Sequence, residues 1–273
     1  ILPKDVSTQR RGSDEQIEYS TYRKEILAKR GSESYAEYGF YERDGIRYVL
    51  YHLDGHLGVD EGSAFEDACK LANAQNLPLV TIVTSGGADQ HQNTLGLFQM
   101  DATIQALNQY PPSMHINVDV GLVYGGVPAS FAGVADIKII VEGKETKKGF
   151  TGPFIVAKSL GLDPETDNAR DAAYKVLPPG THTPLNHFLD RTVDIITPNL
   201  ETASEKIAHL LHIFRDPATI TDSTIVFTPK EAIGQREAFD RTTRPDRPGQ
   251  TFVAWIRHKV GGTLWDRHKP SEG

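Results

Sequence analysis

The chain has 273 residues, 38% of them hydrophobic, which is enough to bury a core in one large domain or two modest ones. Its formal net charge of −7 argues against nucleic acid or an anionic membrane as the main partner, because both require a basic field over a whole face. Cys69 is the only cysteine, which excludes a disulfide framework or a thiolate zinc site within this chain and fits a reducing cytoplasm.

The start of the chain carries no targeting signal that we recognise. Its first residues are polar, without the apolar core of a signal peptide, and no run in the sequence approaches the roughly 18 apolar residues of a membrane helix. The first residue is Ile rather than Met, so a processed chain or a piece of a longer protein is possible.

Helix and hairpin patterns come first along the chain. Residues 15–32 place apolar side chains at helical spacing and end near a glycine, which predicts a helical arm within residues 1–34. Residues 37–56 predict a two-strand hairpin that turns at Arg43-Asp44-Gly45.

From residue 62 onward, helical patterns alternate with apolar runs rich in Val and Ile. This alternation predicts parallel strands covered by helices on both faces, and hence an α/β fold. The expected helices are 62–76, 88–109 and a short one at 128–135, and the expected strands are 77–85, 115–124 and 136–142.

The last part of the chain reads mostly as helices. Residues 154–161, 168–176 and 200–216 have helical patterns, and residues 192–196 predict one further strand. Beyond residue 216 the composition becomes rich in Arg, Lys and Pro. We therefore expect one domain over residues 35–216, followed by a C-terminal extension or linker over 217–273.

Two apolar strands each end in a pair of glycines. Ser85-Gly86-Gly87 follows the first strand, and Tyr124-Gly125-Gly126 follows the next. The start of a helix offers unbonded N–H groups and a partial positive charge, and glycine lets a ligand approach them. Paired glycines also serve simply as tight turns, but their repetition at equivalent places favours a site for a developing oxyanion, such as a thioester enolate.

Three segments, taken in order, resemble one family. LGVDEGSAFEDACKLANAQNLPLVTIVTSGGA, VYGGVPASFAGVADIKIIVE and GFTGPFIVAKSLG resemble the beta subunit of bacterial acetyl-CoA carboxylase carboxyltransferase and the N-terminal half of acyl-CoA carboxylase beta chains. The resemblance covers roughly residues 35–215. It implies the crotonase-like (ClpP/crotonase) fold, in which ββα units stack into a superhelix.

The same resemblance implies the site residues. Gly125 and Gly126 would supply the oxyanion-hole amides, with Gly86 and Gly87 as the neighbouring catalytic turn. The residues implied to bind substrate are Ser85, Ala88, Tyr124, Phe150, Thr151, Gly152 and Pro153.

The implied reaction moves a carboxyl group from carboxybiotin to an acyl-CoA such as acetyl-CoA, giving malonyl-CoA without a metal. Neither Met100 nor Met114 precedes a lysine, so the biotin is expected on a separate carrier protein or domain. The chain has no G-x-x-x-x-G-K-[ST] motif, so ATP-driven carboxylation of biotin is expected elsewhere. The resemblance further implies an alpha-type carboxyltransferase subunit, or a second copy, as the partner that completes the site.

The sequence also departs from the family pattern. Asp89 stands where the family usually has arginine, and the segment before Phe150, which is largely apolar in the family, reads GKETKKG here. Lys144, Lys147 and Lys148 would either contact CoA phosphates or form a solvated turn. The four-cysteine zinc ribbon of the bacterial subunit is missing.

Other side chains leave alternatives open. His91 and Glu142 are candidate acids or bases, whereas Ser85 lacks the elbow motif of a nucleophile. His52 and His56 are expected at a solvated hairpin edge, and the i, i+3 pair of His209 and His212 lacks a third metal ligand.

Three other functions remain as alternatives to carboxyl transfer. The first is a crotonase-like acyl-CoA decarboxylase, hydrolase or hydratase, of which the malonate decarboxylase subunit is the nearest variant. The second is a non-catalytic scaffold subunit. A dinucleotide-binding sheet is disfavoured, because neither glycine turn gives G-x-G-x-x-G.

Overall fold

The computed structural model describes residues 34–143, 145–163, 172, 175 and 181–215. The expected N-terminal arm, the C-terminal extension and most of the expected helix at 168–176 lie outside the described residues. Within them, the α/β fold expected from the alternating pattern is confirmed.

The chain enters the sheet through the predicted hairpin. β1 (Ala36–Arg43) pairs antiparallel with β2 (Ile46–Asp54), and Arg43 lies opposite Ile46. The two turn residues, Asp44 and Gly45, have φ values of 54° and 74°. Positive φ at both central residues is what a type I′ turn requires, and Asp-Gly tolerates it well.

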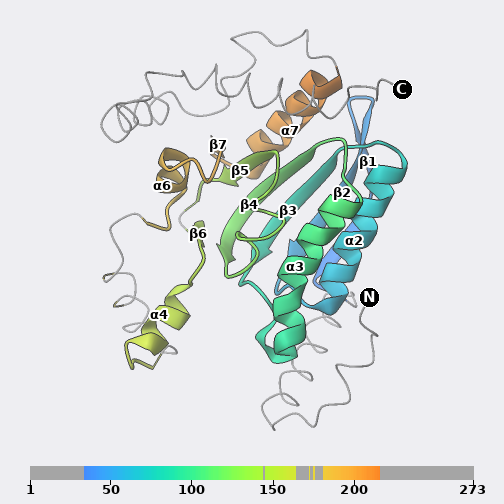
Figure 1. The fold of residues 1–273 in the computed structure, drawn as a ribbon. Helices are drawn as coiled ribbons and strands as arrows, with labels where there is room; N and C mark the ends of the chain where they lie inside the picture. Colours follow the sequence, from blue (N-terminus) through green and yellow to red (C-terminus); the bar gives the residue numbers. More distant parts are fainter. Residues whose placement is uncertain (1–33, 144, 164–171, 173–174, 176–180, 216–273) are drawn as a thin grey trace, which may run out of the picture.

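The remaining strands run parallel to β2 in the order β1-β2-β3-β4-β5-β7 (Figure 1). A short strand, β6, lies off this path and pairs with the second half of β4. The bounds of these strands are β3 (Leu79–Ser85), β4 (His115–Tyr124), β5 (Ile137–Val141), β6 (Lys147–Gly149) and β7 (Ile195–Thr197).

An irregularity in β4 decides which strand lies beside the second glycine turn. Asp119 lies opposite Val83, yet Val123 lies opposite Ser85, so β4 carries extra residues between them. Gly121, with φ 65°, lies within this bulge. Because bulges bend a strand and end its pairing, β4 pairs with β5 before the bulge and with β6 after it.

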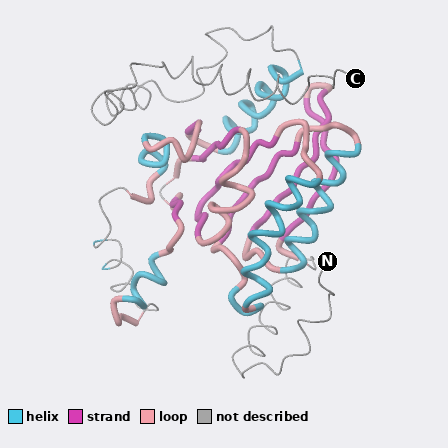
Figure 2. Tube along the Cα trace, viewed as in Figure 1, coloured by secondary structure: helices cyan, strands magenta, loops and turns pink. Residues whose placement is uncertain are grey.

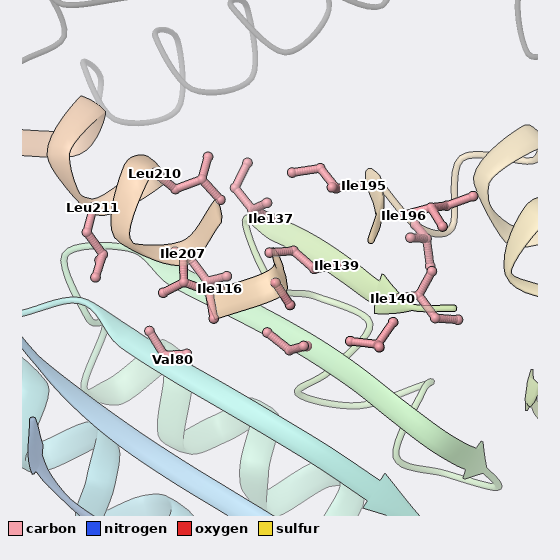
Figure 3. Close-up of a cluster of buried hydrophobic side chains, with 14 of the residues drawn as sticks. Val80, Ile116, Ile137, Ile139, Ile140, Ile195, Ile196, Ile207, Leu210 and Leu211 are labelled. Atoms are coloured by element: carbon pink, nitrogen blue, oxygen red, sulfur yellow. The ribbon is translucent and has the colours of Figure 1, made fainter. Parts of the chain in front are cut away.

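Helices cover both faces of the sheet (Figures 1 and 2). α2 (Val59–Ala74) and α3 (Thr94–Gln109) lie side by side on one face, where Phe65 belongs to a buried cluster with β2 and β3 residues. α7 (Leu200–Arg215) covers the other face. Figure 3 shows Ile207 of this helix beside Ile116 of β4, in the same buried cluster as the isoleucines of β5 and β7.

Two helix predictions need correction. The helix expected over 88–109 begins only at Thr94, because Asn93 has a φ of 49° that interrupts helical geometry. A short 3-10 helix, η2 (Gln90–Gln92), precedes it. Residues 128–135 form successive turns instead of a helix: the amide of Ser130 donates to Val127 O at 3.1 Å, an i to i−3 bond that is too tight for an α-helix.

Two short elements escaped the sequence pattern. β6 has three residues, and α6 (Pro184–Leu189) has six. Neither is long enough to show a period of 2.0 or 3.6, so periodicity could not predict them. By contrast, α4 (Pro153–Ser159) lies close to the helix expected at 154–161.

Cys69 lies in the core between α2 and the sheet. Burial, followed by the nearby Glu66 carboxylate, raises the pKa of this thiol to about 12. A thiolate is the nucleophilic form of cysteine, so Cys69 is a packing residue in the folded chain.

Candidate active site

The two glycine turns lie in direct contact at the carboxyl ends of β3 and β4. A Cβ atom added to Gly87 would lie 2.9 Å from Gly125 Cα, and one added to Gly125 would lie 2.9 Å from Gly87 Cα. Both residues also have positive φ, 109° at Gly87 and 69° at Gly125. Only glycine satisfies both conditions, so the repeated motif brings two backbone segments together with no side chain between them.

The first turn uses most of its polar groups internally. The amide of Gly87 donates to Ser85 Oγ at 3.1 Å, and the carbonyl of Gly87 accepts from the amide of Leu57 at 2.9 Å. Ser85 is buried, and Ala88 forms a bridge with Leu57. Gly86, in contrast, is exposed to solvent. The Ser85 hydroxyl therefore shapes the turn, and Gly86 is the turn residue that a ligand can reach.

The second turn lies under a methionine of α3. Gly126 is buried, and a Cβ atom added there would overlap with Met100 Sδ. Gly125 beside it is partly exposed. In the sequence, Met100 is notable only because no lysine follows it, which excludes it from a Met-Lys biotin attachment site. Its contact with Gly126 depends on the placement of α3, which the sequence pattern does not specify.

Tyr124 connects the second turn to the segment that follows β6. Its side chain is only 5% exposed. A Cβ atom added to Gly152 would lie 3.5 Å from Tyr124 Cγ, and the Tyr124 ring lies 5.4 Å from the ring of His182. The expected site residues Tyr124 and Gly152 are thus neighbours, with the tyrosine ring packed against the backbone of the Phe-Thr-Gly-Pro segment.

The other residues of this segment differ in exposure. Phe150 is 71% exposed, whereas Thr151 and Gly152 are half-buried. Pro153 opens α4, a position where its missing N–H has no helical partner to lose. An aromatic ring so exposed is available to a ligand or to a partner chain.

A buried ion pair fixes β6 to β4. Lys148 Nζ lies 2.5 Å from Asp119 Oδ2, and the two side chains are 4% and 0% exposed. The expectation that Lys148 would contact CoA phosphates or a solvated turn is wrong, because its charge is used inside the protein. Lys147, on the same strand, is half-buried.

The second oxygen of Asp119 continues the network across the sheet. Asn117 Nδ2 donates to Asp119 Oδ1 at 2.7 Å, and Thr81 Oγ1 donates to Asn117 Oδ1 at 2.8 Å. Both carboxylate oxygens therefore have a donor, as a buried charge requires. The GKETKKG segment departs from the family pattern by its charged residues. Of these, Lys148 is buried, and its charge is balanced by the carboxylate of Asp119.

His187 of α6 holds the other side of β6. Its Nε2 lies 2.7 Å from the carbonyl oxygen of Lys148, and its Nδ1 lies 2.7 Å from Thr192 Oγ1. A carbonyl only accepts, so Nε2 carries the hydrogen. Burial lowers the pKa of His187, and the bond to the Lys148 carbonyl opposes this effect. The net effect favours the neutral form of this imidazole.

The pKa shift of His187 makes stability depend on pH. In the unfolded chain histidine has a pKa of about 6.5, and in the folded chain the pKa of His187 is lower. Below about pH 6.5 the unfolded state therefore binds more protons than the folded state. The contribution is complete above that pH and is lost as the pH falls. We expect His187→Gln to flatten the dependence: between about pH 7.5 and about pH 5.5 the free energy of unfolding should fall less than in wild type. Urea unfolding followed by circular dichroism measures this, and parallel slopes would contradict it.

Asp89 has a structural role that the departure from the family pattern did not suggest. It is buried, and its Oδ1 accepts a hydrogen bond from the amide of His91 at 3.0 Å, which caps η2. Its own amide donates to Leu57 O at 2.9 Å. The carboxylate thus caps a helix start, a favourable place for a negative charge.

The structure places the candidate acids and bases in different surroundings. His91 is exposed in η2, and Glu142 is exposed just after β5. His52 lies 3.1 Å from Glu37 Oε1 in the hairpin, as the edge location predicted. His209 is half-buried in α7, and burial is the main cause of its lowered pKa.

In the part of the chain that the structure describes, no three His, Cys, Asp or Glu side chains come together as metal ligands would. None of the helices in that part combines the length and apolar character needed to cross a bilayer.

His56 is a candidate site residue that the sequence pattern did not indicate. It is exposed, as expected, but its ring lies against the first glycine turn: Nε2 is 2.9 Å from where a Cβ atom of Gly86 would be. One signal was available in the sequence. His56 follows the end of a predicted strand, and the carboxyl ends of parallel strands share one edge of a sheet.

Comparison with known proteins identifies the fold first. A transcarboxylase 12S structure, solved with hydrolysed methylmalonyl-coenzyme A bound, has a TM-score of 0.57 at 17% identity and covers 68% of this chain and 38% of that chain. A Pseudomonas malonate decarboxylase hetero-tetramer in complex with malonate has a TM-score of 0.54 at 18% identity and covers 85% and 84% of the two chains. The chain therefore has the crotonase fold, as the resemblance implied.

Comparison of sequences relates the chain to carboxyltransferase beta subunits. The acetyl-coenzyme A carboxylase carboxyl transferase subunit beta of Bartonella tribocorum is 30% identical over 174 residues, which are 63% of this chain and 52% of that protein. The resemblance to carboxyltransferase beta subunits is confirmed. The chain spans about half or less of the length of the curated relatives that it matches. No family model matches it.

Proposed function

We propose that the chain is a beta-type subunit of a biotin-dependent carboxyltransferase, which moves a carboxyl group from carboxybiotin to an acyl-CoA such as acetyl-CoA and gives malonyl-CoA. The observation that carries the proposal is the contact of Gly87 with Gly125 at the carboxyl ends of β3 and β4. Open parallel sheets bind ligands at this edge, and the sequence relatives named as carboxyltransferase subunits support this chemistry.

The chain's own part in this reaction is to stabilise negative charge. We assign the amides of Gly125 and Gly126 to the oxygen that becomes negative when the thioester forms an enolate. A backbone donor positioned in advance at such an oxygen contributes on the order of a hundredfold in rate. Gly86 and Gly87 form the facing turn, where the missing Cβ atoms let the ring of His56 lie against Gly86 and the backbone of Gly125 lie against Gly87.

The carrier-borne group provides the remaining chemistry. When bound, carboxybiotin supplies the carboxyl group, and its ureido nitrogen supplies the base for the α-proton of the acyl group. Because carboxybiotin supplies the base, the protein can act through backbone groups, which are what the glycine turns of this site offer. Tyr124 and Gly152 would position the Phe150 segment along the ligand, and Ser85 and Ala88 would shape the opposite wall.

Partners and location are part of the proposal. We infer an alpha-type subunit or a second copy that completes the site, and a biotin carboxyl carrier protein that delivers the biotin in the cytoplasm. Fused beta/alpha relatives and the hetero-tetrameric malonate decarboxylase support an arrangement of two such chains. The exposed ring of Phe150 is a candidate contact for either.

The reaction is tested most directly in reverse. The chain, with and without a candidate alpha-type subunit, is incubated with malonyl-CoA and biotin or a biotinylated carrier. Formation of carboxybiotin together with acetyl-CoA is the expected result. Release of carbon dioxide from malonyl-CoA at the same rate without any biotin source would instead favour the decarboxylase alternative.

The decarboxylase alternative is favoured by one observation, the imidazole of His56 beside Gly86, because a decarboxylase needs its own hydrogen-bond donor or acid.

The variant Gly126→Val distinguishes a catalyst from a scaffold, because it places a branched side chain where Met100 Sδ lies. A folded Gly126→Val chain should lose turnover if the protein is a catalyst. A scaffold should keep its assembly function.

A further inference from the structure

His56 is held beside the first glycine turn by the backbone on both sides of it. The amide of Gly55 donates to Thr84 O at 2.9 Å, and the amide of Leu57 donates to Gly87 O at 2.9 Å. These bonds connect the residues before and after His56 to the end of β3 and to the turn itself. The position of the His56 backbone is therefore set by the same strand end that forms the turn.

A buried carboxylate anchors the next residues. The amide of Gly58 donates to Glu61 Oε2 at 3.0 Å, and Glu61 is fully buried. The amide of Val59 donates to Gln92 Oε1 at 2.8 Å. The amides on both sides of His56 are thus bonded, and a loop held in this way presents a side chain in a defined place.

The imidazole ring touches Gly86 from the side where a Cβ atom would be. Nε2 is 2.9 Å from that Cβ position, and a carbon–carbon bond is about 1.5 Å long, so Nε2 lies within about 4.4 Å of Gly86 Cα. Both residues are exposed. A ligand that reaches the open side of Gly86 therefore also comes within reach of this nitrogen.

We propose that His56 donates a hydrogen bond from Nε2 to an anionic oxygen of an acyl group held at the Gly86 turn. The ligand class is a CoA thioester with a carboxylate on its acyl group, such as malonyl-CoA. This inference rests on the proposed function. It adds a side-chain donor to a site otherwise assigned to backbone amides, and it gives a reason for glycine at position 86, because a methyl group there would displace the ring.

The test measures binding, so that it does not depend on turnover. Isothermal titration of the full chain with malonyl-CoA and, separately, with CoA compares wild type with His56→Ala and His56→Gln. A lost hydrogen bond to a charged group should weaken malonyl-CoA by about tenfold and leave CoA within about twofold. Gln carries an N–H at a similar reach, so His56→Gln should recover part of the affinity. His52→Ala is the matched control, because His52 lies in the same hairpin and contacts Glu37.

The variant Gly86→Ala tests the contact between His56 and Gly86 in a second way. It keeps His56 but moves its ring, so it should weaken malonyl-CoA as His56→Ala does, and adding it to His56→Ala should have less than about a threefold further effect. Equal affinity of His56→Ala and wild type for malonyl-CoA, no binding of malonyl-CoA at all, or full multiplication of the two losses overturns the inference. Failure of the proposed function is seen separately, as the absence of carboxybiotin formation.

Discussion

Lys148→Met is expected to lower the free energy of unfolding by about 3 to 5 kcal/mol, because it leaves Asp119 charged and buried without its cation. Asp119→Asn should have a similar effect, since it leaves the ammonium group of Lys148 alone in the core. Losses of this size are a large part of the roughly 5 to 15 kcal/mol that stabilises an ordinary domain. Urea unfolding followed by circular dichroism measures them.

The double variant Asp119→Asn/Lys148→Met should recover most of the loss. With both charges removed, no ion is left buried, and replacement of a buried pair by neutral side chains is often close to neutral in free energy. The amide introduced at position 119 can still bond to Asn117, whose Nδ2 lies 2.7 Å from Asp119 Oδ1 in wild type. Losses that simply add in the double variant would show that the two side chains do not act as a pair.

This pair also bears on the site. Lys148 is the central residue of β6, and Gly149, which ends that strand, leads directly into the Phe150 segment beside Tyr124. Without the ion pair, β6 keeps a short backbone ladder with β4 and the bond from His187 to the Lys148 carbonyl. We therefore attribute the placement of the Phe-Thr-Gly-Pro segment to a buried charge as much as to strand pairing.

Gly125→Ala is expected to reduce carboxyl transfer by about a hundredfold or more, the scale of effect that a shift of about 1 Å has on positioned reacting groups. The added methyl carbon would lie 2.9 Å from Gly87 Cα, closer than Cβ atoms come to a backbone atom in real proteins, and in tight contact with Gly86 O at 3.3 Å. The turns must then separate. Positive φ at position 125 adds a strain of about 1 kcal/mol to the free energy of folding.

Gly45→Ala separates strain from steric contact. Gly45 has a φ of 74°, close to that of Gly125, yet no atom outside its chain neighbours lies within 4 Å of an added Cβ position. It should lose about 1 kcal/mol of stability and keep its activity. Steady-state assay of both variants, with unfolding curves as a check of folding, makes the comparison. Equal activity of a folded Gly125→Ala chain and wild type would rule out the contact of the turns as a catalytic feature.

Several features of the fold could be predicted from local sequence. The strands at 77–85 and 115–124 follow from their Val and Ile runs, and the hairpin turn from Asp44-Gly45, because periodicity and turn chemistry act between near neighbours in the chain. The start of α3 was misplaced for a related reason. Asn93 adopts a positive φ. Asparagine tolerates this conformation, but an asparagine in the sequence is not enough to predict it.

Sequence alone was enough to establish an α/β protein with two glycine turns after neighbouring strands, and its resemblance pointed to the carboxyltransferase fold. Only the folded chain shows which groups meet there: Gly87 against Gly125, Lys148 with Asp119, and His56 beside Gly86. These contacts depend on strand order, on the bulge in β4 and on a three-residue strand. Partners far apart in the chain are brought together by the packing of the whole sheet, and no local pattern of residues encodes that packing.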